Sequence, residues 1–225
     1  MTANAIIFDL DNCLAAADEI GRDLLEPMFD AIRRANHGHL AADQLERAFT
    51  DCWRSAFDTV AHEHGFSDEM LAAGWLVARE LRVTAPMRGY PDLHVLKQLS
   101  GALFLVTTGF RAFQDSKIDA LGLRELFAGV YVDAIDEPGR TDKGQIFSEI
   151  LTQHRLDPRC VLVVGDNPAS EIDAGNRLGI PTVQILRPGV TRTAAATHHI
   201  DGLAGLRRLV GGDAGTQPAT ATRRP

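Results

Sequence analysis

Five short, largely apolar runs recur along the chain, and each is followed by a turn rich in polar residues or glycine. They cover residues 5–8, 103–106, 130–132, 161–164 and 182–186. A continuous rather than alternating apolar pattern is typical of strands that are covered on both faces. Helical patterns separate the later runs, at residues 113–121, 144–151 and 172–178. This alternation predicts an α/β fold with a parallel sheet and right-handed crossovers.

The stretch from residue 16 to residue 88 has a different character. It lacks strand-like runs and is rich in Ala, Leu, Glu and Arg. Helical patterns cover residues 18–36, 42–57 and 68–81, and Ser67 is placed to cap the third helix. We expect the large apolar side chains of this stretch to form a small core rather than a ligand cage; they are Trp53, Phe57, Trp75 and Leu76. The sequence therefore predicts an α-helical insert in an α/β core.

The chain accordingly divides into three parts. Residues 1–15 and 89–210 form the predicted core domain, and residues 16–88 form the insert. From residue 211 the composition turns to Gly, Thr, Ala, Pro and Arg, so we predict that residues 211–225 are a disordered tail. A length of 225 residues with 45% hydrophobic residues suffices for one such domain and its insert.

Composition limits the partners. A formal net charge of −7 disfavours general nucleic-acid binding, which needs a basic surface, but allows a small phosphorylated ligand held by a metal ion. Three scattered cysteines, Cys13, Cys52 and Cys160, show neither a disulfide framework nor zinc spacing. No signal-peptide pattern follows Met1, and no run approaches the roughly 20 apolar residues of a membrane span. We expect a cytoplasmic protein without nucleic-acid or membrane partners, either a monomer or a homodimer.

Positive charge comes almost wholly from arginine, because the only lysines are Lys97, Lys117 and Lys143. A lysine kept in such a chain hints that a compact ammonium group is needed at that position. For any one of the three, a solvated surface position is the alternative.

Two aspartates, Asp9 and Asp11, directly follow the first apolar run. In an open parallel sheet, ligands bind beyond the carboxyl ends of the strands, so both side chains are expected at that crevice. Carboxylates there can ligate Mg²⁺, attack an electrophile or transfer protons. Asp-rich turns also cap helices, so the pair alone leaves both interpretations open.

Two further features are weaker when taken singly. Thr107 ends the second apolar run, where a hydroxyl and adjacent backbone amides can hold phosphate oxygens, although Thr-Gly is also frequent in turns. Lys143 lies at a predicted helix start, which the helix dipole disfavours. A bound anion or the carboxylate of a nucleophile would compensate, and a solvated lysine is the alternative.

The most specific segment begins with the fourth apolar run, which ends in Gly165-Asp166 and is followed by Glu171. Asp166 is expected to reach the same crevice as Asp9. Carboxylates crowded in this way repel one another, and a divalent cation relieves the repulsion.

Taken in order, Asp9-x-Asp11, Thr107, Lys143 and Gly165-Asp166-x-x-x-x-Glu171 resemble the four sequence motifs of the haloacid dehalogenase (HAD) superfamily of hydrolases. The helical insert looks like the C1-type cap of that superfamily, and the resemblance covers about residues 5–190. It implies a Rossmann-like HAD core and Mg²⁺-dependent hydrolysis of a small phosphorylated metabolite.

The resemblance also implies roles for the motif residues. Asp9 would attack phosphorus and form an aspartyl-phosphate, and Asp11 would protonate the leaving alcohol and then help to activate water. The substrate phosphate would be bound by Asp11, Thr107, Thr108 and Lys143. Mg²⁺ would be held by Asp9, the backbone carbonyl of Asp11, Asp166 and, directly or through water, Glu171.

Three positions depart from the family pattern. Cys13 stands where Thr is usual, and Thr108 stands where Asn is frequent. Lys143 lies in a Lys-Gly-x-x-Phe setting rather than Lys-Pro-x-Pro, so Arg140 is a second candidate for its role.

Asp11 separates the possible reactions, because breaking a carbon–halogen bond needs no proton donor and dehalogenases of this type lack an aspartate there. It favours phosphoester hydrolysis, with a phosphosugar mutase or a non-catalytic phosphate- or Mg²⁺-binding module as alternatives. No lysine lies between Asp11 and Arg88 to form the Schiff base of a phosphonatase. Side chains that could contact the substrate, or simply lie on the surface, are Arg22, Arg54, His62, His64 and Arg111.

Overall fold

The computed structural model describes residues 3–211 of the chain. Its centre is one six-stranded sheet with the strand order β3-β2-β1-β4-β5-β6, in which every neighbouring pair is parallel. The strands are β1 (Ala5–Phe8), β2 (Ala102–Gly109), β3 (Gly129–Ala134), β4 (Val161–Gly165), β5 (Thr182–Ile185) and β6 (His198–Ile200). The α/β prediction is confirmed, and the five apolar runs coincide with strands β1 to β5, except that Leu186 lies just beyond β5.

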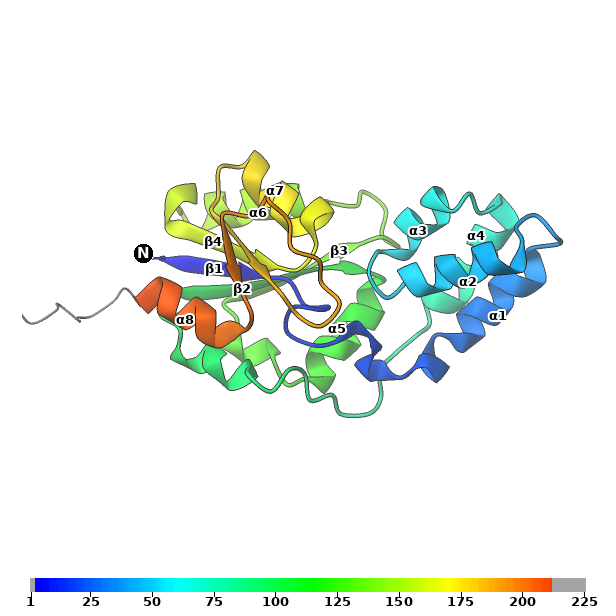
Figure 1. Cartoon of the computed structure of the whole chain (residues 1–225), viewed down its shortest axis with the longest axis horizontal. Helices are drawn as coiled ribbons and strands as arrows, with labels where there is room; N and C mark the ends of the chain where they lie inside the picture. Colours follow the sequence, from blue (N-terminus) through cyan, green and yellow to red (C-terminus); the bar gives the residue numbers. More distant parts are fainter. Residues whose placement is uncertain (1–2, 212–225) are drawn as a thin grey trace, which may run out of the picture.

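Helices cover both faces of this sheet, as continuous apolar strands require (Figure 1). On one face, Ile6 and Phe8 pack with residues of α5 (Arg111–Ala120), α8 (Leu203–Gly211) and the 3₁₀ helix η3 (Leu93–Gln98). On the other face, Ala5 and Ile7 pack with α6 (Lys143–Gln153) and α7 (Asp173–Arg177). Helices α5 and α6 therefore reach the carboxyl ends of the strands from opposite sides.

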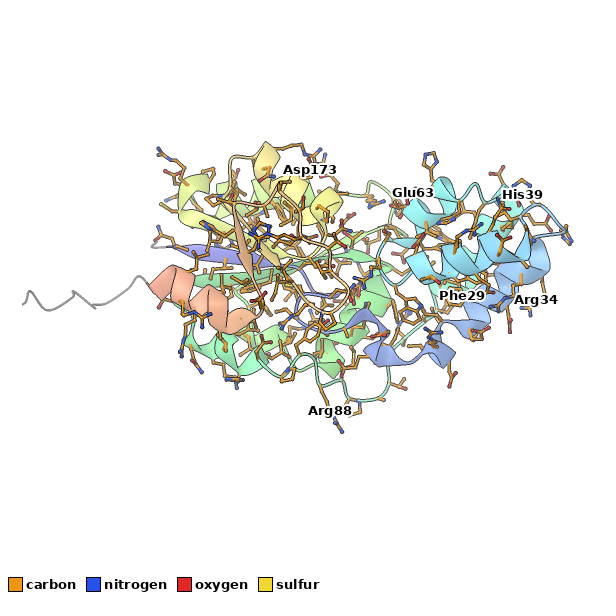
Figure 2. The ribbon with its side chains drawn as sticks, in the orientation of Figure 1. Phe29, Arg34, His39, Glu63, Arg88 and Asp173 are labelled. Carbon is orange, nitrogen blue, oxygen red and sulfur yellow. The ribbon has the colours of Figure 1, made fainter. Side chains whose placement is uncertain are left out.

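Most of the chain between β1 and β2, from η1 to α4, forms a helical lobe beside the sheet, beyond the carboxyl end of β1 (Figure 1). Its helices are η1 (Ala17–Ile20), η2 (Arg22–Leu24), α1 (Glu26–Ala35), α2 (Ala42–Asp51), α3 (Phe57–Glu63) and α4 (Asp68–Ala78). The lobe has its own apolar cluster, in which the rings of Phe29 and Phe49 stack at 4.4 Å between centroids. Arg34 and His39 lie at its far end, away from the sheet (Figure 2).

Several predicted elements differ in detail. The helix expected over residues 18–36 is broken at Gly21, whose φ of 81° is left-handed, so only α1 is a full helix there. The helix expected over residues 42–57 ends at Asp51, and α3 begins separately at Phe57. The expected core position of Leu76 is wrong, because this residue is 66% exposed. Ser67 does cap α4, its hydroxyl accepting from the Met70 amide at 3.3 Å.

Short irregular helices complete the core. They are η4 (Arg124–Leu126), η5 (Pro158–Cys160) and the π-helical turn η6 (Pro168–Ile172), which precedes α7. The strand β6 was not expected, because its sequence His-His-Ile lacks an apolar run. Of the tail expected over residues 211–225, Gly211 ends α8 and the rest lies outside the described residues. Within residues 3–211, no helix has the length and apolar character to cross a membrane.

Candidate active site

Asp9 and Asp166 end two neighbouring strands and therefore meet. Strands β1 and β4 pair in register, with Phe8 opposite Val164, and the Asp9 amide donates to the Val164 carbonyl at 2.9 Å. Both aspartates are buried, at 7% and 8% exposure. The carboxyl ends of these parallel strands thus place two carboxylates side by side, as the spacing of the motifs predicts.

Glu171 joins the pair because Gly165 leaves room for it. A Cβ atom on Gly165 would lie only 2.2 Å from Glu171 Oε1, so the close approach needs glycine at this position. The π-helical turn η6 brings Glu171 back towards the strand end, where its Oε1 accepts from the Asn167 amide at 2.6 Å. Glu171 is 1% exposed. The loop between β4 and α7 is therefore built around one buried carboxylate.

Asp9, Asp166 and Glu171 offer oxygen atoms that all lie within 4.8 Å of one another. Burial, reinforced by the neighbouring carboxylates, raises the pKa of Asp9 to about 7 and that of Asp166 to about 8, although Lys143 opposes both shifts. A hard divalent cation prefers oxygen ligands and would favour the ionised forms of these groups. The donor set therefore fits a metal such as Mg²⁺.

Lys143 supplies positive charge to this cluster. It is the first residue of α6, whose N-terminus is capped by Asp142. Its ammonium donates to Asp9 Oδ1 at 2.7 Å and to Glu171 Oε2 at 3.0 Å. Burial by itself would lower the pKa of Lys143, but Asp9 and Glu171 outweigh it and raise the pKa. The carboxylates thus compensate the unfavourable position of a lysine at a helix start.

Asp11 lies apart from that cluster and has a lysine of its own, which the sequence analysis did not assign to the site. Lys117 Nζ donates to Asp11 Oδ1 at 2.7 Å and to Oδ2 at 2.6 Å. Gln114 Nε2 donates to Asp11 Oδ2 at 3.1 Å. The scarcity of lysine was the available signal, since two of the three lysines pair with the aspartates that follow β1.

A cavity of about 390 Å³ joins these groups to the helical lobe. Two asparagines beside the aspartates hold the lobe over it: Asn12 Nδ2 donates to the Trp53 carbonyl at 3.2 Å, and Asn167 Nδ2 donates to the Arg54 carbonyl at 3.4 Å. Part of the cavity wall is aromatic and is formed by Trp53 and Phe57 of the lobe and by Phe110 and Phe113 at the start of α5. The cavity thus combines charged groups with an aromatic surface to which both the lobe and α5 contribute.

A family model described as haloacid dehalogenase-like hydrolase matches residues 3–179, which span β1 to the turn after α7 and include every carboxylate and lysine described above. The chain belongs to this family. A search of curated proteins returns no match.

Solved structures resemble this HAD-like hydrolase over nearly its whole length. A HAD phosphatase from Thermococcus onnurineus is 21% identical, with a TM-score of 0.61 and coverage of 94% of this chain and 99% of that chain. YfnB from Bacillus subtilis, bound to magnesium, is 16% identical, with a TM-score of 0.60 and coverage of 93% and 99%. L-2-haloacid dehalogenase from Xanthobacter autotrophicus is 16% identical, with a TM-score of 0.58 and coverage of 95% and 100%. At these identities the likenesses show the fold and not the reaction.

The two threonines of this HAD-like hydrolase have different surroundings. Thr107 is 1% exposed and lines the cavity. Thr108 also lines the cavity, but its hydroxyl donates to Asp133 at 3.0 Å on the adjacent strand. Arg140 pairs with the same Asp133 and with Asp58 of the lobe. Arg140 thus connects the helical lobe to the sheet, whereas Lys143 is the residue that contacts Asp9.

The other cationic candidates separate clearly. Arg54 lines the cavity, and its charge acts on Asp166. Arg111 lies outside the lining and pairs with Glu137, its Nη2 reaching Oε2 at 2.8 Å. The lining also lacks three of the proposed substrate contacts, which are Arg22, His62 and His64. A surface position or an ion pair therefore describes these residues better than a contact with the substrate; they are Arg22, His62, His64 and Arg111.

Proposed function

We propose that this HAD-like hydrolase is a Mg²⁺-dependent phosphatase, which hydrolyses a small phosphorylated metabolite through an aspartyl-phosphate on Asp9. One observation carries the proposal: a second aspartate, Asp11, lines the same cavity as Asp9 but lies outside the carboxylate cluster. A dehalogenase has no use for a proton donor at that position, whereas an alkoxide leaving group needs one.

The proposed reaction has two steps. An oxygen of Asp9 attacks phosphorus, the bond from phosphorus to the ester oxygen breaks, and Asp11 passes a proton to that oxygen to release the alcohol. Asp11 then takes a proton from water, the water oxygen attacks phosphorus, and Asp9 leaves as a carboxylate with release of phosphate. Thr107 and Lys143 would hold the oxygens of the transferring group.

Mg²⁺ would be held by Asp9, the backbone carbonyl of Asp11 and Asp166. Both oxygens of Glu171 already accept hydrogen bonds from Lys143 and Asn167, which favours a water-mediated role for this residue. When bound, the ion would screen the repulsion between the Asp9 carboxylate and the phosphate.

We assign the helical lobe, residues 16–88, as a cap that closes over this chemistry and excludes water. Trp53 and Phe57 of the cap, together with Phe110 and Phe113 of the core, give the cavity an aromatic surface, so we infer a substrate with an apolar portion next to its phosphate. A cytoplasmic location suits the three free cysteines.

The test is phosphate release from a panel of phosphate monoesters, with and without Mg²⁺ and with Asp9→Asn as the control. Turnover that needs Mg²⁺ and is lost in the variant supports the proposal. Chloride release from a 2-chloro acid in place of phosphate release would overturn it in favour of a dehalogenase. Binding without turnover across the panel would indicate a non-catalytic module. Transfer of the phosphoryl group to another position of a sugar phosphate would indicate a mutase.

A further inference from the structure

Lys117 is buried, although it is a charged residue of α5, a helix that covers one face of the sheet. Its side chain is 5% exposed, and its ammonium contacts both oxygens of Asp11. The ammonium also lies 4.8 Å from the centre of the Phe113 ring. A buried lysine loses the hydration of its charge, and here the carboxylate and the aromatic face replace that hydration. The ammonium is therefore held at one position by Asp11 and Phe113 together.

Gln114 strengthens the same arrangement from one turn earlier in α5. Its Nε2 donates to Asp11 Oδ2 at 3.1 Å and to the Thr108 carbonyl at 2.6 Å. Because both partners are acceptors, the amide is oriented with its nitrogen towards them. The other end, Oε1, is buried without a hydrogen-bond partner within the described part of the chain. Leaving a buried acceptor unpaired is unfavourable, so the contact with Asp11 is maintained at a free-energy cost.

The backbone before α5 is also adapted to this contact. Gly109 has a φ of 153°, and a Cβ atom there would lie 2.8 Å from Gln114 Nε2. A larger residue at position 109 would displace the Gln114 side chain. Three features of one segment, Gly109, Gln114 and Lys117, thus converge on a single carboxylate.

Asp11 needs such restraint because it lies two residues from Asp9. A free carboxylate at that distance is a potential additional ligand for a cation held by Asp9, Asp166 and Glu171. As a metal ligand it would no longer be available to give or take protons. In the structure, the group of carboxylates able to share a metal contains Asp9 but excludes Asp11.

We propose that Lys117, assisted by Gln114, is a positioning residue that keeps the Asp11 carboxylate out of the metal cluster and in place for both proton transfers. The proton-transfer part of this inference rests on the proposed phosphatase function. In this proposal Lys117 acts through Asp11 rather than on the substrate.

The test uses Lys117→Met in the full-length protein, with Lys97→Met as the matched control because Lys97 is exposed. With an alkyl phosphate, Lys117→Met should lower kcat by at least about tenfold, since part of the acid–base contribution is lost. With p-nitrophenyl phosphate, whose leaving group needs no proton, a burst of one p-nitrophenol per enzyme should precede slow turnover. Lys97→Met should behave as the parent protein.

A double-mutant comparison separates positioning from general damage to the structure. In an Asp11→Asn background, Lys117→Met should have little further effect on kcat, because the group it positions is absent. An equal loss of kcat in both backgrounds, or no burst with the aryl phosphate, would overturn the proposal.

Mg²⁺ binding gives a readout that does not depend on activity. By calorimetry, Lys117→Met should tighten Mg²⁺ binding by at least about threefold, and this gain should shrink in the Asp11→Asn background. An unchanged affinity, or the same gain in both backgrounds, would show that Lys117 does not keep Asp11 from the metal. If the parent protein releases phosphate from no ester, the phosphatase proposal fails, while this titration still decides whether Lys117 positions Asp11.

Discussion

Asp9 and Asp11 are two residues apart, yet the structure gives them different environments. Asp9 shares its lysine, Lys143 of α6, with Glu171, and its side chain is 8% exposed. Asp11 is held by Lys117 of α5, on the opposite face of the sheet, and its side chain is 23% exposed. Two carboxylates close together along the chain thus differ in burial and in charged partner, because helices on opposite faces of the sheet supply their lysines.

The largest effect should come from Asp9→Asn, which removes the proposed nucleophile. Turnover of phosphate esters should fall by at least about 10,000-fold while the protein stays folded. Steady-state phosphate release measures the turnover, and circular dichroism with a thermal melt shows whether the variant is folded. A rate near that of the parent protein would contradict the proposed difference between Asp9 and Asp11, since Asp9 would then not be the nucleophile.

Asp11→Asn should have a smaller effect that depends on the substrate. The loss in kcat should be about 100- to 10,000-fold for an alkyl phosphate. A good leaving group should still phosphorylate Asp9 slowly, because only the second proton transfer is then needed. Rapid-quench detection of phosphorylated protein would reveal the intermediate. Equal losses for good and poor leaving groups would contradict the separate acid–base role of Asp11.

Lys143→Met tests the Asp9 side of the comparison through stability. It leaves Asp9 and Glu171 buried without their cation, which should lower the free energy of unfolding by about 3–5 kcal/mol in Mg²⁺-free buffer. Urea denaturation at neutral pH measures the change. Lys97→Met is the control and should stay within about 0.5 kcal/mol of the parent protein. A loss as small as that of the control would mean that the Lys143 contacts add little to stability.

The smallest effect should be a pH dependence of the metal-free protein. The pKa of Asp9 is raised from 3.8 to about 7 and that of Asp166 from 3.8 to about 8, so the unfolded chain loses these protons first. The free energy of unfolding should therefore fall as pH rises from about 4 to about 8 and change little above that.

Added Mg²⁺ should oppose this loss, because it favours the ionised carboxylates. The rise in Tm on adding Mg²⁺ should thus be larger at pH 8 than at pH 5, as measured by calorimetric melts. An Asp9→Asn, Asp166→Asn double variant should lose most of both trends. A Mg²⁺ effect independent of pH would argue that the two aspartates do not bind the ion.

The sequence by itself determined strands β1 to β5, the helical insert and the positions of Asp9, Asp11, Lys143 and Asp166 at the ends of predicted elements. Apolar runs report burial on both faces of a strand, and residues just after parallel strands reach one edge of the sheet. Such signals are local, so they can be recognised without knowing how the chain packs. The break at Gly21 was less visible, because a glycine inside a helical pattern is often tolerated.

Only the tertiary structure decided the partners of Asp11, Thr108 and Arg140. Lys117 and Asp11 are 106 residues apart, and their pairing depends on α5 packing against the sheet. The same holds for Thr108, whose hydroxyl points to Asp133 on the neighbouring strand, and for Arg140, which reaches Asp58 in the lobe. These contacts between elements depend on how helices and strands pack together, and no local pattern in the sequence predicts them.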